Sequence, residues 1–209
     1  MSRKVSEKDI QKSNRIVLLL IVGIPTLIIL MSTGLFLLAD NRVIDLGVSS
    51  KGQLIQPPIQ LLDADLKNTD LSFFDYGTPD PRWTFLVIGG AQCDELCQRM
   101  LYFTRQAHKA SGKMMNDISR MYLNTSMQSS ASLEQFLSEE HQDVSHVYVE
   151  SSKLNELAQG KVDIANPYRF YLVDRRGWLM MQYQAKDLDD LSLSDLSKDV
   201  IKDLKRLMQ

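Results

Sequence analysis

Hydrophobic residues follow two different patterns along this chain of 209 residues. Near the N-terminus, residues 16–38 form a run of 23 residues without a charged side chain. In a helix such a run extends about 34 Å, which is enough to cross the hydrocarbon core of a bilayer. From residue 82 onward, short apolar runs alternate with segments of helical spacing. These patterns predict one transmembrane helix followed by a separate folded domain.

The second pattern predicts an α/β fold. Residues 82–88 hold a continuous run of aromatic and β-branched side chains, typical of a strand buried on both faces. Apolar residues spaced by three and four predict a helix over 94–109. Further strands are expected at 118–123, 144–149, 170–173 and 178–183, and further helices at 133–137, 151–159 and 188–207. Strands alternating with helices favour an α/β sheet, to which a hairpin around Asp174–Gly177 adds an antiparallel edge.

The apolar N-terminal run has two alternative interpretations. A cleaved signal peptide would have a shorter apolar stretch and a small-x-small cleavage site, which residues 37–40 (Leu-Leu-Ala-Asp) lack. A buried helix of a soluble protein is the other alternative. We favour an uncleaved anchor. Five cationic residues precede the run, and only Arg42 and Lys51 follow it closely, so the positive-inside rule places the N-terminus in the cytoplasm.

These patterns divide the chain into four parts. We expect a cytoplasmic tail at 1–15, the transmembrane helix at 16–38, a periplasmic tether at 39–70 and the folded domain at 71–209. The tether is expected because glycine, serine and the pair Pro57-Pro58 interrupt any regular period there. In a bacterium this topology describes a single-pass protein of the inner membrane whose C-terminal domain is periplasmic.

Composition and charge narrow the range of functions that this chain could have. The apolar content of 44% supports a packed core, and the net charge of −2 does not suit a nucleic-acid-binding surface. The chain shows no Ser-His-Asp order, phosphate-binding loop or zinc-ligand spacing. The candidate chemistry therefore lies with two cysteines.

Cys93 and Cys97 are the only cysteines, and they follow the strand predicted at 82–88. Residues four apart share one face of a helix at about 6 Å between Cα atoms, within the range of a disulfide. Closing so short a loop removes little chain entropy, so a purely stabilising role is a poor explanation. The pair predicts redox chemistry or a soft metal site, with an inert buried or disulfide-linked pair as the alternative. The helix dipole favours a thiolate here, whereas Asp94 and Glu95 oppose it.

A dithiol at the first strand-to-helix turn of this element order resembles a thioredoxin-like domain. Together with a single N-terminal anchor and C-x-x-x-C spacing, it resembles the SCO/SenC family of copper chaperones; thioredoxins and related membrane reductases have C-x-x-C. Residues 51–58, Lys-Gly-Gln-Leu-Ile-Gln-Pro-Pro, are also similar to the segment that leads into bacterial SCO-like domains. The chain is thus identified as a divergent member of that family.

The resemblance implies a copper site formed by Cys93, Cys97 and a histidine shortly before a Tyr-Leu-x-Asp-x-x-Gly segment, here residues 171–177. Asn166 occupies the histidine position, and a carboxamide is a poor copper ligand. Two thiolates alone can hold Cu(I). Pro167 lies near the position of the thioredoxin cis-proline, but we interpret it as an ordinary strand-entry proline, with a cis bond as the alternative. The chain's histidines, which we expect to be structural or at the surface, are His108, His141 and His146.

The resemblance implies a membrane-anchored periplasmic assembly factor for cytochrome c oxidase, with the oxidase subunits as partners. Cys93 and Cys97 would act by thiol–disulfide exchange or by delivering Cu(I), and the missing histidine favours exchange. Two alternatives stay open. One is a general periplasmic thiol–disulfide oxidoreductase, and the other is a non-catalytic module that binds oxidase subunits. Nucleic acid is not an expected partner.

Overall fold

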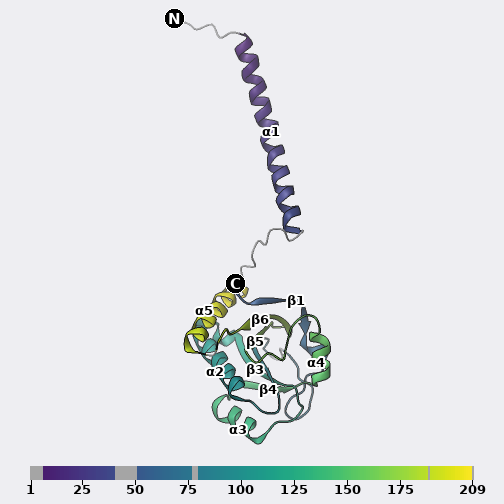
Figure 1. Cartoon of the computed structure of the whole chain (residues 1–209), viewed down its shortest axis with the longest axis vertical. Helices are drawn as coiled ribbons and strands as arrows, with labels where there is room; N and C mark the ends of the chain where they lie inside the picture. Colours follow the sequence, from purple (N-terminus) through teal and green to yellow (C-terminus); the bar gives the residue numbers. More distant parts are fainter. Residues whose placement is uncertain (1–6, 41–50, 77–79, 188, 209) are drawn as a thin grey trace. The chain divides into compact units, whose positions relative to one another are not determined.

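The computed structural model of the chain describes residues 7–40, 51–76, 80–187 and 189–208 (Figure 1). The chain forms two compact units, Met1–Ser49 and Ser50–Gln209. The described residues of the first unit form one long helix, and the second unit contains the α/β domain with both cysteines.

The first unit holds helix α1, Glu7–Asp40, of 34 residues with Pro25 inside it. Its segment Val17–Leu37 has a mean hydropathy of 2.4 over 21 residues, and none of it is buried. Polar groups within this segment bond to the helix itself, since the hydroxyls of Thr26 and Thr33 donate to carbonyl oxygens four residues earlier at 2.7 and 2.8 Å. By length and composition this helix can span a membrane, as predicted. The helix already begins at Glu7, within the predicted tail, whose residues 1–6 lie outside the described residues.

Within the described part of the second unit, six strands form one mixed sheet of order β1-β6-β5-β2-β3-β4. The strands are β1 (Gln53–Gln60), β2 (Trp83–Gly89), β3 (Ile118–Asn124), β4 (Val144–Tyr148), β5 (Arg169–Val173) and β6 (Trp178–Gln184). Strands β2, β3 and β4 are parallel, whereas β5 is antiparallel to β2, and β6 is antiparallel to both β5 and β1. The parallel strands therefore end at one edge of the sheet, where the cysteines follow β2.

Helices cover both faces of this sheet (Figure 1). They are α2 (Glu95–Ala110), α3 (Ala131–Glu140), α4 (Ser151–Ala158) and α5 (Asp190–Leu207), with short 3-10 helices η1 (Leu61–Ala64) and η2 (Gly112–Asp117). One core includes Phe85, Phe103 and Phe170, and packs under α2, α3 and α5. The opposite core includes Leu86 and Leu154, and packs under α4 and η1. Strand β2 lies between these two cores and buries side chains on both faces from Thr84 to Val87, which explains its continuous apolar run.

The predicted elements agree closely with the structure. All five strands and four helices predicted from residue 82 onward are present, with ends that differ by a few residues. Helix α3 is longer than predicted, because Ser130 caps it by accepting a hydrogen bond from the Leu133 backbone at 3.2 Å. Leu188, which the pattern assigns to the last helix, lies outside the described residues. The described residues thus form an α/β domain and one candidate membrane helix.

The tether predicted for 39–70 is wrong in its second half. Residues 53–60 form β1, which pairs with β6 at the edge of the sheet, and the compact unit begins at Ser50 rather than at residue 71. The prediction failed because Pro57 and Pro58 suggested irregular structure. Proline is compatible with an edge strand, and the β1–β6 register is irregular between Leu54 and Ile59, where the prolines lie. Residues 41–50 of the expected tether lie outside the described residues.

The segment before β1 is fixed to the last helix by a buried carboxylate. Asp203 of α5 is 1% exposed and accepts hydrogen bonds from the backbone N–H groups of Lys51, at 2.7 and 3.0 Å, and Gly52, at 2.8 Å. The Tyr183 hydroxyl donates to the same carboxylate at 3.2 Å. A Cβ on Gly52 would lie 2.6 Å from the Tyr183 ring, so the close approach requires glycine. The start of the domain is therefore tied to its C-terminal helix.

A second buried polar cluster lies under α2, around Arg120 of β3. Its guanidinium donates to both carboxylate oxygens of Asp143 at 3.0 Å, to the Leu101 carbonyl at 2.5 Å and to the Thr104 hydroxyl at 3.1 Å. It also lies 3.3 Å from Nδ1 of His141. The arginine is 1% exposed, so these partners compensate for the removal of its charge from water.

Candidate functional site

The candidate site lies where β2 ends and the chain turns into α2. Gly89 is the last residue of β2, and a Cβ there would lie 2.2 Å from the Tyr122 hydroxyl of β3. Only glycine allows this close approach. The Tyr122 hydroxyl then donates to the Gly90 carbonyl at 2.8 Å. The end of the buried strand is therefore held against its neighbour.

Three further hydrogen bonds hold the loop that carries the cysteines. The backbone N–H and the hydroxyl of Thr125 donate to the Gly89 carbonyl at 2.9 and 3.0 Å. The backbone N–H of Ser130 donates to the Ala91 carbonyl at 2.8 Å. Loop residues 89–91 are thus fixed to the segment between β3 and α3, so the cysteines that follow start from a defined position.

Asp94 begins helix α2 as its N-cap residue. Its side-chain oxygen Oδ1 accepts a hydrogen bond from the backbone N–H of Cys97 at 2.9 Å. The side-chain amide of Gln98 donates to the Cys93 carbonyl at 3.0 Å. A cap of this kind satisfies one of the backbone N–H groups that a helix leaves free at its start.

Cys93 and Cys97 are joined by a disulfide bond, with 5.2 Å between their Cα atoms. The sequence predicts this proximity from their spacing along a helix. The geometry differs in one respect, because Cys93 lies just before α2 and only Cys97 is inside it. Both side chains are half-buried and pack against the core under α2. The two sulfurs therefore form one half-buried disulfide bond at the turn from β2 into α2.

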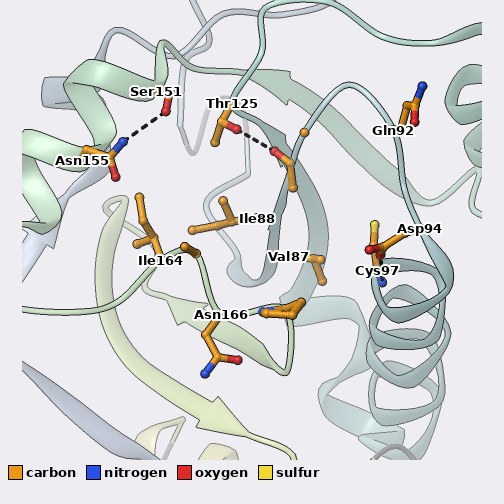
Figure 2. A pocket seen from close by; sticks show the side chains of 14 residues that line it. Val87, Ile88, Gln92, Asp94, Cys97, Thr125, Ser151, Asn155, Ile164 and Asn166 are labelled. Carbon is orange, nitrogen blue, oxygen red and sulfur yellow. Dashed lines mark hydrogen bonds between the residues drawn. The ribbon is translucent and has the colours of Figure 1, made fainter.

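A cavity of about 330 Å³ opens beside this bond (Figure 2). Cys97 and Asp94 line one side of it, and the ends of β2 and β3 contribute Ile88 and Thr125. The opposite side is formed by the start of α4 and by the segment before β5, with Ser151, Asn155, Ile164, Ala165, Asn166 and Pro167. The cavity combines apolar walls with uncharged polar groups, and Asp94 is the one carboxylate among its lining residues.

Asn166, at which the resemblance implies a histidine, lines the same cavity as Cys97. Its side-chain oxygen accepts a hydrogen bond from the Tyr168 backbone N–H at 2.9 Å. In Figure 2 its carboxamide points away from Cys97. Asn166 therefore shapes the turn before β5. The cis peptide bond among the described residues is Gln56–Pro57, and Pro167 is trans, as its interpretation as a strand-entry proline predicts.

The three histidines lie in structural environments away from the cavity lining. His108 contacts the carbonyls of Met115 and Ile118 at 3.0 Å. His141 is buried, and burial followed by the charge of Arg120 lowers its pKa to about 4. His146 lies between two tyrosine rings, and burial lowers its pKa. This agrees with the expectation that they have structural roles.

The donor set does not match a three-ligand copper site. Cys93 and Cys97 are bonded to each other, and Asn166 uses its oxygen in a backbone turn. Among the described residues, no group of three or more His, Cys, Asp or Glu side chains is placed to hold a metal ion. A third ligand of the imidazole type is therefore missing beside the two sulfurs.

Several cavity residues were not predicted from the sequence. Thr125 directly follows β3, and Ser151 follows β4. One signal could have identified this region, because ligands of α/β sheets bind beyond the carboxyl ends of parallel strands. The contribution of Ile164 could not be foreseen, since it belongs to an irregular segment that only the fold brings across to Cys97.

Comparisons with known proteins agree with this architecture. Yeast Sco1 with copper bound superposes with a TM-score of 0.51 at 14% identity, covering 76% of this chain and 95% of that chain. A SCO1/SenC family lipoprotein from Bacillus anthracis str. Ames gives a TM-score of 0.50 at 17% identity, covering 74% and 99%. At these identities the likeness establishes a shared fold. A search of curated protein sequences gave no match.

The sequence of the domain also matches a family profile. Residues 83–209 match the family described as "transmembrane-like, thioredoxin-like, C-terminal domain". This range runs from the start of β2 to the end of the chain and includes the cysteines and the cavity described above. The chain therefore belongs to the family of transmembrane-like, thioredoxin-like C-terminal domains.

Proposed function

We propose that this protein is a membrane-anchored, SCO-like thiol–disulfide exchange factor that acts through Cys93 and Cys97. The observation that carries the proposal is the half-buried disulfide beside an open cavity, at the turn from β2 into α2. A disulfide that closes a loop this short adds little stability. Its position is better explained by contact with a partner's sulfur.

The exchange balances with a partner that carries two thiols. A partner thiolate attacks one sulfur of the Cys93–Cys97 bond, which breaks and releases the other sulfur as a thiolate. The second partner thiol then attacks the resulting mixed disulfide. The partner leaves with a disulfide, and this chain gains two electrons and two protons as a dithiol. In the reverse direction, the dithiol reduces a partner disulfide.

The membrane helix and the SCO-like resemblance extend the proposal to location and partner. The excess of cations before the apolar segment favours a cytoplasmic N-terminus and a periplasmic domain in a bacterial inner membrane. The resemblance favours subunits of a respiratory copper oxidase, whose copper-site cysteines the reduced Cys93–Cys97 pair would keep in the thiol form. A general periplasmic oxidoreductase would use the same bond with broader specificity.

Thiol exchange is preferred over Cu(I) delivery because of the donors beside the sulfurs. Asn166 replaces the implied histidine and directs its oxygen to the Tyr168 backbone. A carboxamide is in any case a weak ligand for a soft ion. Cu(I) would be cargo held by the two thiolates of the reduced chain. Anaerobic Cu(I) titration of the reduced full chain tests this role, and unchanged stoichiometric uptake by Cys93→Ser would contradict it.

Equilibrium with a thiol–disulfide buffer tests the exchange activity. The full chain in detergent micelles is incubated with mixtures of reduced and oxidised glutathione, and the dithiol fraction is measured by maleimide labelling. We expect a single two-electron transition, because one bond is accessible from the cavity. The double variant Cys93→Ser/Cys97→Ser is the control and should take no label. A folded wild-type chain that shows no transition, even with dithiothreitol, would contradict the proposal.

Single serine variants test which sulfur the partner reaches. Cys97 lines the cavity, whereas Cys93 is not among the lining residues. We expect Cys97 in the Cys93→Ser variant to react at least about tenfold faster with a peptide disulfide than Cys93 in the Cys97→Ser variant. The rates are compared by mass spectrometry at a pH where both thiols are ionised, so that they report access. Faster reaction of Cys93 would contradict the assignment.

A further inference from the structure

Asp94 lies between the two cysteines in sequence and lines the cavity together with Cys97. Its carboxylate is exposed and accepts the backbone N–H of Cys97 at 2.9 Å. Figure 2 shows Asp94 and Cys97 together on the side of the cavity formed by α2. The residue therefore contributes a negative charge and occupies a backbone donor at the point where the disulfide would be reduced.

We propose that Asp94 holds the Cys93–Cys97 pair toward its oxidised form, by taking up a helix N–H and by repelling the thiolate that reduction creates. This inference rests on the proposed exchange function and identifies Asp94 as a residue that controls the redox equilibrium of the cysteine pair. At the start of a helix, free N–H groups and the helix dipole stabilise a thiolate and so favour the reduced state. Asp94 opposes both effects at this site.

The other charged groups near the bond do not offset Asp94. Among the residues that line the cavity, none is lysine, arginine or histidine. On α2, Glu95 adds a second negative charge, but its carboxylate lies 3.7 Å from the guanidinium of Arg99 and lines a different cavity. From β3, the neutral hydroxyl of Tyr122 faces the loop and donates to Gly90. Asp94 is therefore the one charged residue that lines the cavity beside Cys97.

The charge of Asp94 also affects Tyr122, a residue of β3 that contacts the cysteine loop. Burial, and after it the negative charge of Asp94, raises the pKa of Tyr122. Its ring belongs to β3 and packs below the loop at Gly89 and Gly90. Tyr122 and Asp94 therefore both lie at the loop that carries the disulfide.

The variant Asp94→Asn removes the charge and keeps a side chain that caps helices well. On the reduced full chain in micelles, the rate of alkylation by iodoacetamide is followed against pH. We expect the apparent thiol pKa to fall by about one unit, which corresponds to about tenfold more thiolate below that pKa. The reduced form should also gain in the glutathione equilibrium, and this gain should grow as the pH rises toward the thiol pKa.

Glu95→Gln is the matched control, since it removes a carboxylate one residue further on that faces Arg99. It should change the thiol pKa much less than Asp94→Asn. A purely structural role of Asp94 would leave the pH profile of alkylation in place, so an unchanged profile overturns this inference. Failure of the wild-type chain to exchange with glutathione would instead overturn the proposed function, because alkylation requires no partner disulfide.

Discussion

Asp203→Ala is expected to lower the free energy of unfolding of the α/β domain by about 3–5 kcal/mol. The carboxylate is 1% exposed and accepts hydrogen bonds from the backbone of Lys51 and Gly52 and from the Tyr183 hydroxyl. Alanine leaves these donors buried or half-buried without an acceptor. Urea unfolding of the full chain in micelles, followed by tryptophan fluorescence, measures the change.

The matched control is Asp195→Ala on the same helix. Asp195 is exposed and pairs with Lys198 at 2.9 Å, so its loss should cost less than about 1 kcal/mol. The free energy of unfolding of Asp203→Asn should lie between those of the two alanine variants, because one side-chain oxygen remains as an acceptor. Equal stability of Asp203→Ala and Asp195→Ala would contradict the assignment of Asp203 as the group that fixes the start of the domain.

Acidification from pH 7 to pH 4 is expected to destabilise the domain, with His141 contributing up to about 3 kcal/mol. Burial, followed by the charge of Arg120, lowers the pKa of His141 from 6.5 to about 4. As the pH falls below 6.5, the unfolded chain binds a proton at this residue, whereas the folded chain binds it only near pH 4. Stability is therefore full above pH 6.5 and is lost between 6.5 and about 4.

Urea unfolding at several pH values measures this loss, and His141→Gln should flatten the profile in that window. His146→Gln is a useful second variant, because burial also lowers the pKa of His146 and acts in the same direction. Asp143 contributes to the loss of stability only at lower pH. Burial raises its pKa, but the hydrogen bond and charge of Arg120 outweigh that effect and lower it, so its contribution is lost only in stronger acid. If the free energy of unfolding of His141→Gln falls with pH as steeply as that of the wild-type chain, other groups cause the acid sensitivity.

The hydrogen bonds that position the cysteine loop also contribute to its stability. The cysteine loop is held by Tyr122 and Thr125 of β3 and the segment after it, and β3 also carries Arg120 at its other end. Strand β3 thus supports both the loop that carries the disulfide and the polar cluster under α2. Acid conditions that weaken the cluster around Arg120 should therefore also loosen the support of the loop.

The order of strands and helices from residue 82 onward and the position of the dithiol were determined by the sequence alone. The spacing of apolar residues and the turn residues between them predict the strands, the helices and the hairpin around Asp174–Gly177. Each of these signals involves residues that lie close together in the sequence. The membrane helix follows from an uncharged run of sufficient length. The proximity of Cys93 and Cys97 follows from their separation of four residues. These are local properties, and local patterns predict them well.

Only the tertiary structure decided the roles of Asp203, Asn166 and β1. Asp203 bonds to Lys51 across 152 positions of sequence, and no periodicity relates two residues so far apart. Asn166 has the sequence position of a ligand, but the turn before β5 directs its oxygen to the Tyr168 backbone. β1 contains two prolines and becomes a strand because β6 offers it an edge to pair with. Such features depend on which groups the fold brings together, since their hydrogen bonds form only between distant segments.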